Sequence, residues 1–192
     1  MGKIKTVFYA GPSIYGLKIK ALSKELWRGP ACCGDILRDT IRYRPKMIVL
    51  IDGVFHHSMS VWHKELVFAL LQGVVCIGAA SMGALRAAEM HRYGMIGVGK
   101  IFEMYRHGEE DDSLVALSFD PISFRPFSEP TIGHQQKRQD AMEAIEFARS
   151  YRGKVSTTLT AEAISPFMEA LIMSTLNDIY GRRSRARHVT AD

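Results

Sequence analysis

The chain has 192 residues, of which 47% are hydrophobic and 23% charged, proportions typical of a folded globular protein rather than a disordered one. Its longest apolar stretch, residues 73–80, is much shorter than the roughly 20 residues of a membrane span. The first five residues, Met1 to Lys5, lack an apolar signal region. We therefore expect a cytoplasmic protein without membrane segments.

The formal net charge is +5, and much of the excess lies in residues 181–188 near the C-terminus. Such a run is usually a solvated tail, although it could also contact an acidic partner. The rest of the chain is close to neutral and has no basic stripe interleaved with aromatic residues. The composition therefore gives little support to nucleic-acid binding.

Short apolar runs alternate with helical patterns through the first half of the chain. The predicted order is strand Thr6–Ala10, a helical segment to about Leu26, strand Lys46–Ile51, helix Val61–Leu71 capped by Ser60, strand Gly73–Gly78 and helix Met82–His91. This alternation predicts an α/β fold, an open and mostly parallel sheet with flanking helices.

The second half of the chain has a different pattern. Glycine-rich loops and an acidic run precede a predicted strand, Leu114–Leu117. Helices are predicted over Gln135–Arg152 and Thr160–Tyr180, which form a C-terminal helical extension. We divide the chain into an α/β core at 1–130, the helical extension at 131–181 and a basic tail at 182–192.

Ligands of open α/β sheets bind outside the carboxyl ends of the strands. That rule selects three loops, residues 11–13, 52–57 and 79–83. The first, Gly11-Pro12-Ser13, could offer amide groups or the Ser13 hydroxyl to an anion, or could simply be a turn. The chain has neither G-x-G-x-x-G nor a P-loop, so we expect no nucleotide bound through those motifs and no cofactor.

Ser81 lies among small residues between a predicted strand and a predicted helix. This is the layout of a nucleophile elbow, which exposes a serine hydroxyl and places the next amide, here Met82, beside an oxyanion. Ala79 stands where the usual motif has its first glycine. The alternative is that Ser81 only caps the helix and that the small residues allow close packing.

A catalytic serine needs a base, and His63 in the first turn of the preceding helix is the candidate. Glu65 or Asp52 could orient the imidazole, and Lys64 is a rival base if it is buried. The alternative reading makes His63, Lys64 and Glu65 solvated charges. His56 and His57 are adjacent without further ligands at metal spacing, so we predict no metal site.

Three cysteines are too few for a disulfide framework. Cys76 lies in an apolar run and is expected to be buried. Cys32 and Cys33 lie in a loop flanked by glycine and proline, where a thiolate could form, although chance neighbours are the simpler reading.

Several sequence blocks, in this order, resemble the TfuA family. They are Gly11-Pro12-Ser13, Pro30-Ala31 with Gly34-Asp35-Ile36, Ile51-Asp52-Gly53 with Phe55, Val61 to Glu65, Gly78 to Glu89, Gly94-Met95, Gly97 to Gly99, Tyr105, Gly108, Asp111-Asp112 and Ser128 to Pro130. The blocks span about the first 130 residues, and the match beyond Pro130 is poor.

The resemblance implies an accessory protein that works with a YcaO enzyme in peptide backbone thioamidation, the YcaO partner using ATP. It also implies hydrolysis of a thiocarboxylated, ThiS-like sulfur carrier to release sulfide. The candidate catalytic residues are Ser81, His63, Glu65 and Asp52, and the residues expected at the substrate or oxyanion are Gly11, Pro12, Ser13, Met82, Lys64 and His56. A persulfide relay through Cys32 and Cys33 does not follow from the resemblance.

Two other functions fit the sequence. The chain could be a docking module for the YcaO enzyme and the carrier without chemistry of its own, since the C-terminal segment has apolar residues such as Ile164, Phe167 and Leu171. It could also be an unrelated serine hydrolase of small esters. Whether the chain associates with copies of itself stays open.

Overall fold

A computed structural model describes residues 4–54, 59–108, 118–127 and 133–154. Its centre is a sheet of five parallel strands, in the order β2-β1-β3-β4-β5. The strands are β1 (Thr6–Tyr9), β2 (Glu25–Arg28), β3 (Met47–Leu50), β4 (Val75–Ala79) and β5 (Ile96–Val98). The predicted α/β class is confirmed.

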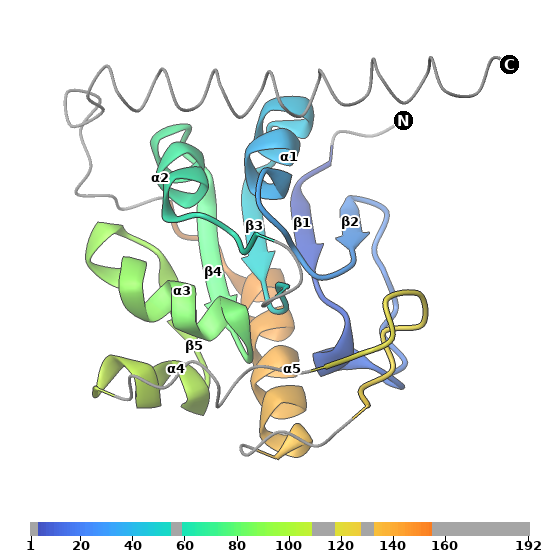
Figure 1. The fold of residues 1–192 in the computed structure, drawn as a ribbon. Coiled ribbons are helices and arrows are strands. Elements are labelled where there is room, and N and C mark those ends of the chain that lie inside the picture. Colours follow the sequence, from blue (N-terminus) through green and yellow to red (C-terminus); the bar gives the residue numbers. More distant parts are fainter. Residues whose placement is uncertain (1–3, 55–58, 109–117, 128–132, 155–192) are drawn as a thin grey trace, which may run out of the picture.

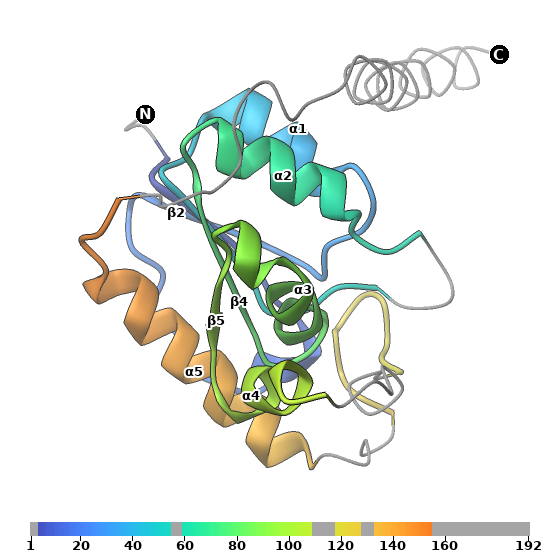
Figure 2. The same ribbon diagram turned by 90° about the vertical axis from the view of Figure 1, so that its left-hand side faces the viewer.

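Helices cover both faces of the sheet (Figure 1). The helices are α1 (Asp35–Tyr43), α2 (His63–Leu71), α3 (Met82–Met90), α4 (Lys100–Arg106) and α5 (His134–Ser150). Figure 2 shows α5 on one side of the sheet and α1, α2 and α3 on the other. The central strands β1, β3 and β4 are therefore covered on both faces.

The two cores explain why the central strands are continuous apolar runs. Side chains alternate across a strand, so Val7 and Tyr9 belong to the core under α1 to α3, whereas Phe8 belongs to the core under α5. In β3, Ile48 and Val49 divide between the two cores in the same way. A strand covered on both faces has no polar side.

Some elements differ from the sequence prediction. The helix expected between Ser13 and about Leu26 is wrong: this segment holds a short 3₁₀ turn, η1 (Pro12–Ile14), and then β2. The segment that contains β5 and α4 was expected to consist of loops. Helix α2 begins at His63, with Trp62 at the N-cap position, and the expected cap Ser60 instead donates a hydrogen bond to the Val54 carbonyl.

The predicted strand Leu114–Leu117 and the predicted helix Thr160–Tyr180 lie outside the described residues. Helix α5, which we assigned to a C-terminal extension, packs through Ala141, Ala144 and Ile145 onto the sheet. The division of the chain at residue 130 stays a prediction. No helix in the described ranges has the length and apolar composition to cross a membrane.

The order of the strands identifies the place where a ligand site is expected. The chain passes from β1 to the edge strand β2 and then returns to β3 on the opposite side of β1. The carboxyl ends of β1 and β3 therefore flank the switch point of the sheet, where open α/β proteins bind ligands. The loops that leave these two strands contain Ser13 and Asp52.

Candidate functional site

Asp52 holds the loop after β1 against the end of β3. Its Oδ2 accepts hydrogen bonds from the amides of Gly11 at 2.7 Å and Ser13 at 3.0 Å, and its Oδ1 accepts one from the Ser13 hydroxyl at 2.6 Å. Ser13 is 0% and Asp52 1% exposed. The structure thus brings three sequence-predicted residues together at the switch point. Pro12, between them, is buried in the first turn of η1.

This arrangement changes the role expected for the Gly11–Ser13 loop. We had assigned the loop to a substrate or oxyanion, but the amides of Gly11 and Ser13 donate to Asp52 in this structure. Met82, the other predicted oxyanion donor, is the first residue of α3. Amides in the first turn of an α-helix have no acceptor within the helix and favour negative charge.

Lys137 on α5 adds a cation near Ser13 and Asp52, and we call these three residues the switch-point cluster. Its side chain is fully buried, and Asp52 attracts it electrostatically. Burial lowers the pKa of Lys137 to about 8, and the Asp52 carboxylate acts in the opposite direction. A lysine with this pKa exchanges its proton near neutral pH.

The pKa of Asp52 is shifted in the opposite direction to that of Lys137, upward. Complete burial raises the pKa of the Asp52 carboxyl, whereas the hydrogen bonds from Ser13 and Gly11 and the charge of Lys137 lower it. The carboxylate is therefore a stronger base than an aspartate in water. Paired titratable groups whose pKa values are shifted by burial are typical of active sites.

Sequence reasoning missed Lys137, although its spacing carried a signal. The buried residues of α5 recur along one helical face, namely Lys137, Asp140, Ala141, Ala144, Ile145 and Ala148. Lys137 lies one turn before Ala141 on this face, where an apolar residue is expected. A lysine in an apolar stripe is a candidate for a functional charge because burying a charged group costs free energy.

The small residues around Ser81 allow α3 to approach the sheet closely. A Cβ atom on Gly83 would lie 1.8 Å from the Leu50 carbonyl oxygen, and one on Gly78 would lie 2.1 Å from the Gly83 carbonyl oxygen. The Gly83 amide donates to the Ile51 carbonyl at 3.2 Å. The first turn of α3 therefore lies on the end of β3, and the packing explanation of this motif holds for both glycines.

Ser81 occupies the N-cap position of α3, but its side chain makes no capping hydrogen bond there. Its amide donates to the Ile51 carbonyl at 3.3 Å, which places its backbone beside Asp52. The residue is only 3% exposed, so the prediction of an exposed hydroxyl is wrong. The positive φ angle of this turn belongs to Ala80, at 65°, so the strained residue precedes the serine.

His63 points to a different part of α3. Its Nε2 lies 2.8 Å from Oε2 of Glu89, which also accepts a 2.7 Å hydrogen bond from Arg86. The carboxylate beside His63 is therefore Glu89, and the expectation that Glu65 or Asp52 orients it is wrong. Glu89 is about two helical turns, roughly 12 Å, from Ser81 along α3. Among the described residues no hydrogen bond joins His63 to Ser81.

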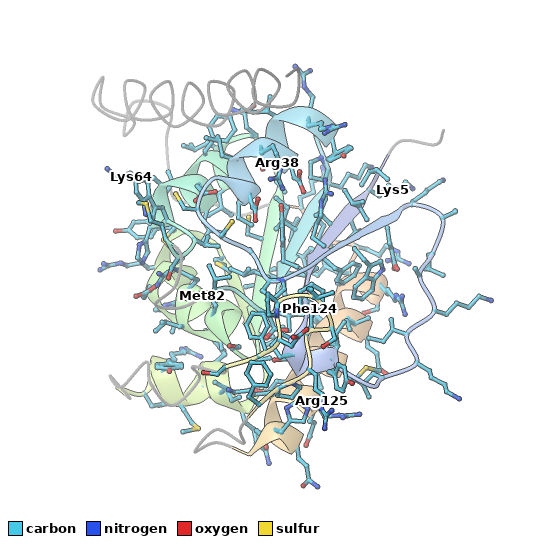
Figure 3. All side chains as sticks on the ribbon, turned by 45° about the vertical axis from the view of Figure 1, so that its right-hand side comes forward. Lys5, Arg38, Lys64, Met82, Phe124 and Arg125 are labelled. Atoms are coloured by element: carbon cyan, nitrogen blue, oxygen red, sulfur yellow. The ribbon has the colours of Figure 1, made fainter. Side chains whose placement is uncertain are left out.

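Glu65 makes its hydrogen bonds to groups other than Asp52. Glu65 is buried and accepts hydrogen bonds from the amides of Trp62 at 3.1 Å and Leu37 at 3.3 Å, so it joins α2 to α1. Burial raises the pKa of Glu65. Lys64 lies toward the outside of the molecule in Figure 3, whereas Met82 lies nearer its centre. His56 is outside the described residues.

An aromatic side chain covers the Gly11 loop. A Cβ atom on Gly11 would lie 3.4 Å from Cγ of Phe124, and one on Gly29 would lie 2.7 Å from its Cζ. Phe124, labelled near the middle of Figure 3, therefore packs against two residues that have no side chain. Its φ angle of 58° is unusual for a bulky residue. This cover contributes to the burial of the loop that contacts Asp52.

Cys32 and Cys33 are unsuited to thiolate chemistry in this environment. Burial, followed by the nearby Asp35 carboxylate, raises the pKa of Cys32 to about 12. Burial and the Glu65 carboxylate raise the pKa of Cys33 to about 11. Both thiols are therefore protonated at neutral pH. In the described ranges no group of three His, Cys, Asp or Glu side chains could hold a metal ion.

Comparison with protein families gives a match to the model described as TfuA-like protein over residues 52–166. The matched range begins at Asp52 and includes Ser81 and Lys137, so it contains most of the switch-point cluster and all of α5. A search of curated proteins finds no significant match. Because the family model covers more than half of the chain, we conclude that this chain belongs to the TfuA-like protein family.

Proposed function

We propose that this protein supports peptide backbone thioamidation by a YcaO enzyme, and that it hydrolyses a thiocarboxylated, ThiS-like sulfur carrier to release sulfide. Membership of the TfuA-like family supports the accessory role. The observation that carries the hydrolytic role is the buried set of Ser13, Asp52 and Lys137 at the switch point of the sheet. It contains a hydroxyl, a base for that hydroxyl and a cation.

The roles follow from the contacts. A thiocarboxylate is an anion, so Lys137 supplies the complementary charge. The Ser13 hydroxyl already donates to Asp52, and an acceptor at 2.6 Å is within reach for general-base catalysis. The contact with Asp52 favours Ser13 as the attacking hydroxyl, because His63, the predicted base for Ser81, contacts Glu89 instead. Since Ser13 is 0% exposed, the reaction requires the Gly11 loop to open to the substrate first. The amide of Met82, with Ser81 beside it, would then stabilise the oxyanion.

The proposed reaction has two steps. In the first, Ser13 oxygen adds to the thiocarboxylate carbon and Asp52 takes the hydroxyl proton; Asp52 then passes this proton to the sulfur as the carbon–sulfur bond breaks, and hydrosulfide leaves. In the second, Asp52 takes a proton from water as its oxygen adds to the resulting ester, and this proton passes to the Ser13 oxygen as the carbon–oxygen bond to Ser13 breaks. The carrier departs with a carboxylate, and the second proton of the water goes to solvent. A protonated Lys137 offsets the negative charge in both steps.

The test measures sulfide release from a purified thiocarboxylated carrier, with mass spectrometry of the carrier terminus. We expect Asp52→Asn and Ser13→Ala each to slow release by about 10²-fold or more, as loss of a general base or nucleophile does. Ser81→Ala is measured in parallel, and a smaller loss is expected because Ser81 acts on the oxyanion side. Unchanged release in both Asp52→Asn and Ser13→Ala would contradict the proposal.

The alternative function, docking without chemistry, predicts a different result. In that case the wild-type protein would bind the carrier or the YcaO enzyme but would not accelerate carrier hydrolysis at all. For a variant that removes the Lys137 charge, Lys100→Met is the matched control, because it removes the same charge from an exposed lysine on α4.

A further inference from the structure

The edge of the sheet opposite to Asp52 contains a cavity of about 740 Å³. It lies between the amino-terminal ends of the strands, marked by Lys5 and Lys46, and the C-terminal end of α5, marked by Arg149 and Arg152. Ligand sites in proteins commonly measure about 300–1,000 Å³. The size therefore suits a small molecule or a few residues of a peptide.

The charged residues that line this cavity are mostly basic. Its basic lining residues are Lys5, Lys24, Lys46, Arg149 and Arg152, and its acidic one is Glu25. Arg149 neutralises Glu25 through two hydrogen bonds of 2.9 Å. In the described part of the chain none of the other four cations has an ion pair, and all four are exposed. The cavity therefore presents an unbalanced positive rim.

The cavity continues along the edge of the sheet. A second cavity of about 260 Å³ shares Val75 and Tyr151 with the first and is lined by Ile96 at the start of β5 and by Lys154. The two together extend from β2 to β5 along the amino-terminal edge. An extended ligand fits this shape better than a compact anion does.

Part of the lining between the cations is apolar and buried, whereas Leu22 is 50% exposed and Tyr151 is partly exposed. Phe8 is fully buried and stacks on Trp27 with ring centroids 4.3 Å apart, and Met47 and Val75 are each 7% exposed. Recognition of single-stranded nucleic acid uses exposed aromatic faces on which bases stack. Phe8 offers no such face, whereas an acidic peptide needs only the cations and an apolar floor.

We propose that this basic groove, defined by Lys5, Lys24, Lys46, Arg152 and Lys154, is a docking site for an extended acidic segment of a protein partner. The groove lies at the edge of the sheet away from Ser13 and Asp52, so a partner held there does not cover the switch-point site. This inference is independent of the hydrolytic role, and loss of docking would leave hydrolysis of a free carrier intact.

The test uses a fluorescein-labelled peptide of alternating glutamate and leucine, with fluorescence anisotropy as the readout. We expect the wild-type protein to bind it with an affinity that falls as salt is added, as exposed charge pairs require. The double variant Lys24→Glu/Lys46→Glu should lose at least tenfold in affinity. The matched control Lys18→Glu/Lys100→Glu carries the same net charge on exposed sites outside the groove and should retain binding.

Three results would overturn the proposal. They are no binding of the peptide to the wild-type protein, an equal loss in both double variants, and tighter binding of a single-stranded oligonucleotide that the groove variant also abolishes. Thermal unfolding of all variants checks that exposed-site substitutions leave the fold intact. Sulfide release measured on the groove variant separates docking from catalysis, because the proposal predicts an unchanged rate there.

Discussion

The Ser13 hydroxyl donates a 2.6 Å hydrogen bond to Oδ1 of Asp52 across the junction between β1 and β3. Both residues follow strands that are neighbours in the sheet, and both are almost completely buried. Their contact places a hydroxyl and its base at the one point of the sheet where the strand order reverses. The cation of Lys137 reaches this point from α5.

Replacement of Lys137 should change both the rate and the pH dependence of sulfide release. Lys137→Met removes the cation, and we expect a loss of about 10²-fold or more. In the wild-type protein the rate should fall as the pH rises through about 8, because deprotonation removes the charge. It should also fall at acidic pH, where the Asp52 carboxyl is protonated below its raised pKa.

The arginine variant makes this prediction specific. Lys137→Arg keeps the charge at every accessible pH, so its rate, even if lower, should lose the alkaline decline. The measurement is a pH profile of sulfide release between neutral and alkaline pH. An alkaline decline that persists unchanged in Lys137→Arg would assign that titration to another group.

Replacement of His63 should have a small effect on hydrolysis. The imidazole is 48% exposed and contacts Glu89, which lies about two helical turns from Ser81 along α3. We expect His63→Gln to retain sulfide release within about a factor of 3, with stability changed by about 0.5 kcal/mol or less, as for other surface substitutions. A loss comparable to that of Asp52→Asn would return His63 to the reaction.

Removal of the Phe124 ring should open the Gly11 loop to solvent. The ring packs over Gly11, whose amide donates to Asp52. We therefore expect faster hydrogen exchange of the Gly11 and Ser13 amides in Phe124→Ala, because exchange reports local opening. The control Phe127→Ala removes an aromatic ring that is 68% exposed, and exchange of these amides should stay unchanged there.

A side chain at position 83 should separate α3 from the sheet. The new Cβ of Gly83→Ala would lie 1.8 Å from the Leu50 carbonyl oxygen, which is backbone and cannot yield easily. We expect a loss of about 3 kcal/mol in the free energy of unfolding, the upper range for overpacking. Gly133→Ala, where nothing lies within 4 Å, is the control, and urea unfolding of both variants gives the comparison.

Cys32 and Cys33 should react slowly with iodoacetamide at neutral pH. Thiolates are the reactive form, and the pKa values of about 12 and 11 keep both thiols protonated. The rate of alkylation should increase steadily as the pH rises toward 10, with unfolded protein in urea as the fast reference. Rapid modification of the folded protein at pH 7 would show that a thiolate forms in this loop.

The sequence was sufficient to predict the class of fold, because strands and turns can be recognised from short local patterns. Continuous apolar runs such as Lys46–Ile51 indicate strands covered on both faces, and glycine and aspartate mark where those strands end. From these runs alone, the loops at Ser13, Asp52 and Ser81 could be placed at one edge of a parallel sheet. β2 was missed because only two of its four residues, Leu26 and Trp27, are apolar, and charged residues flank them at the edge of the sheet.

Which side chains meet at that edge was decided only by the tertiary structure. Asp52 pairs with Ser13 because β1 and β3 are neighbours, a fact that depends on the chain passing through β2 first. His63 pairs with Glu89 because α2 begins beside the second half of α3 and not beside its first turn. Lys137 reaches Asp52 from α5, which packs on the other face of the sheet from α1, α2 and α3. Its burial depends on contacts between segments far apart in the chain, which the sequence alone does not reveal.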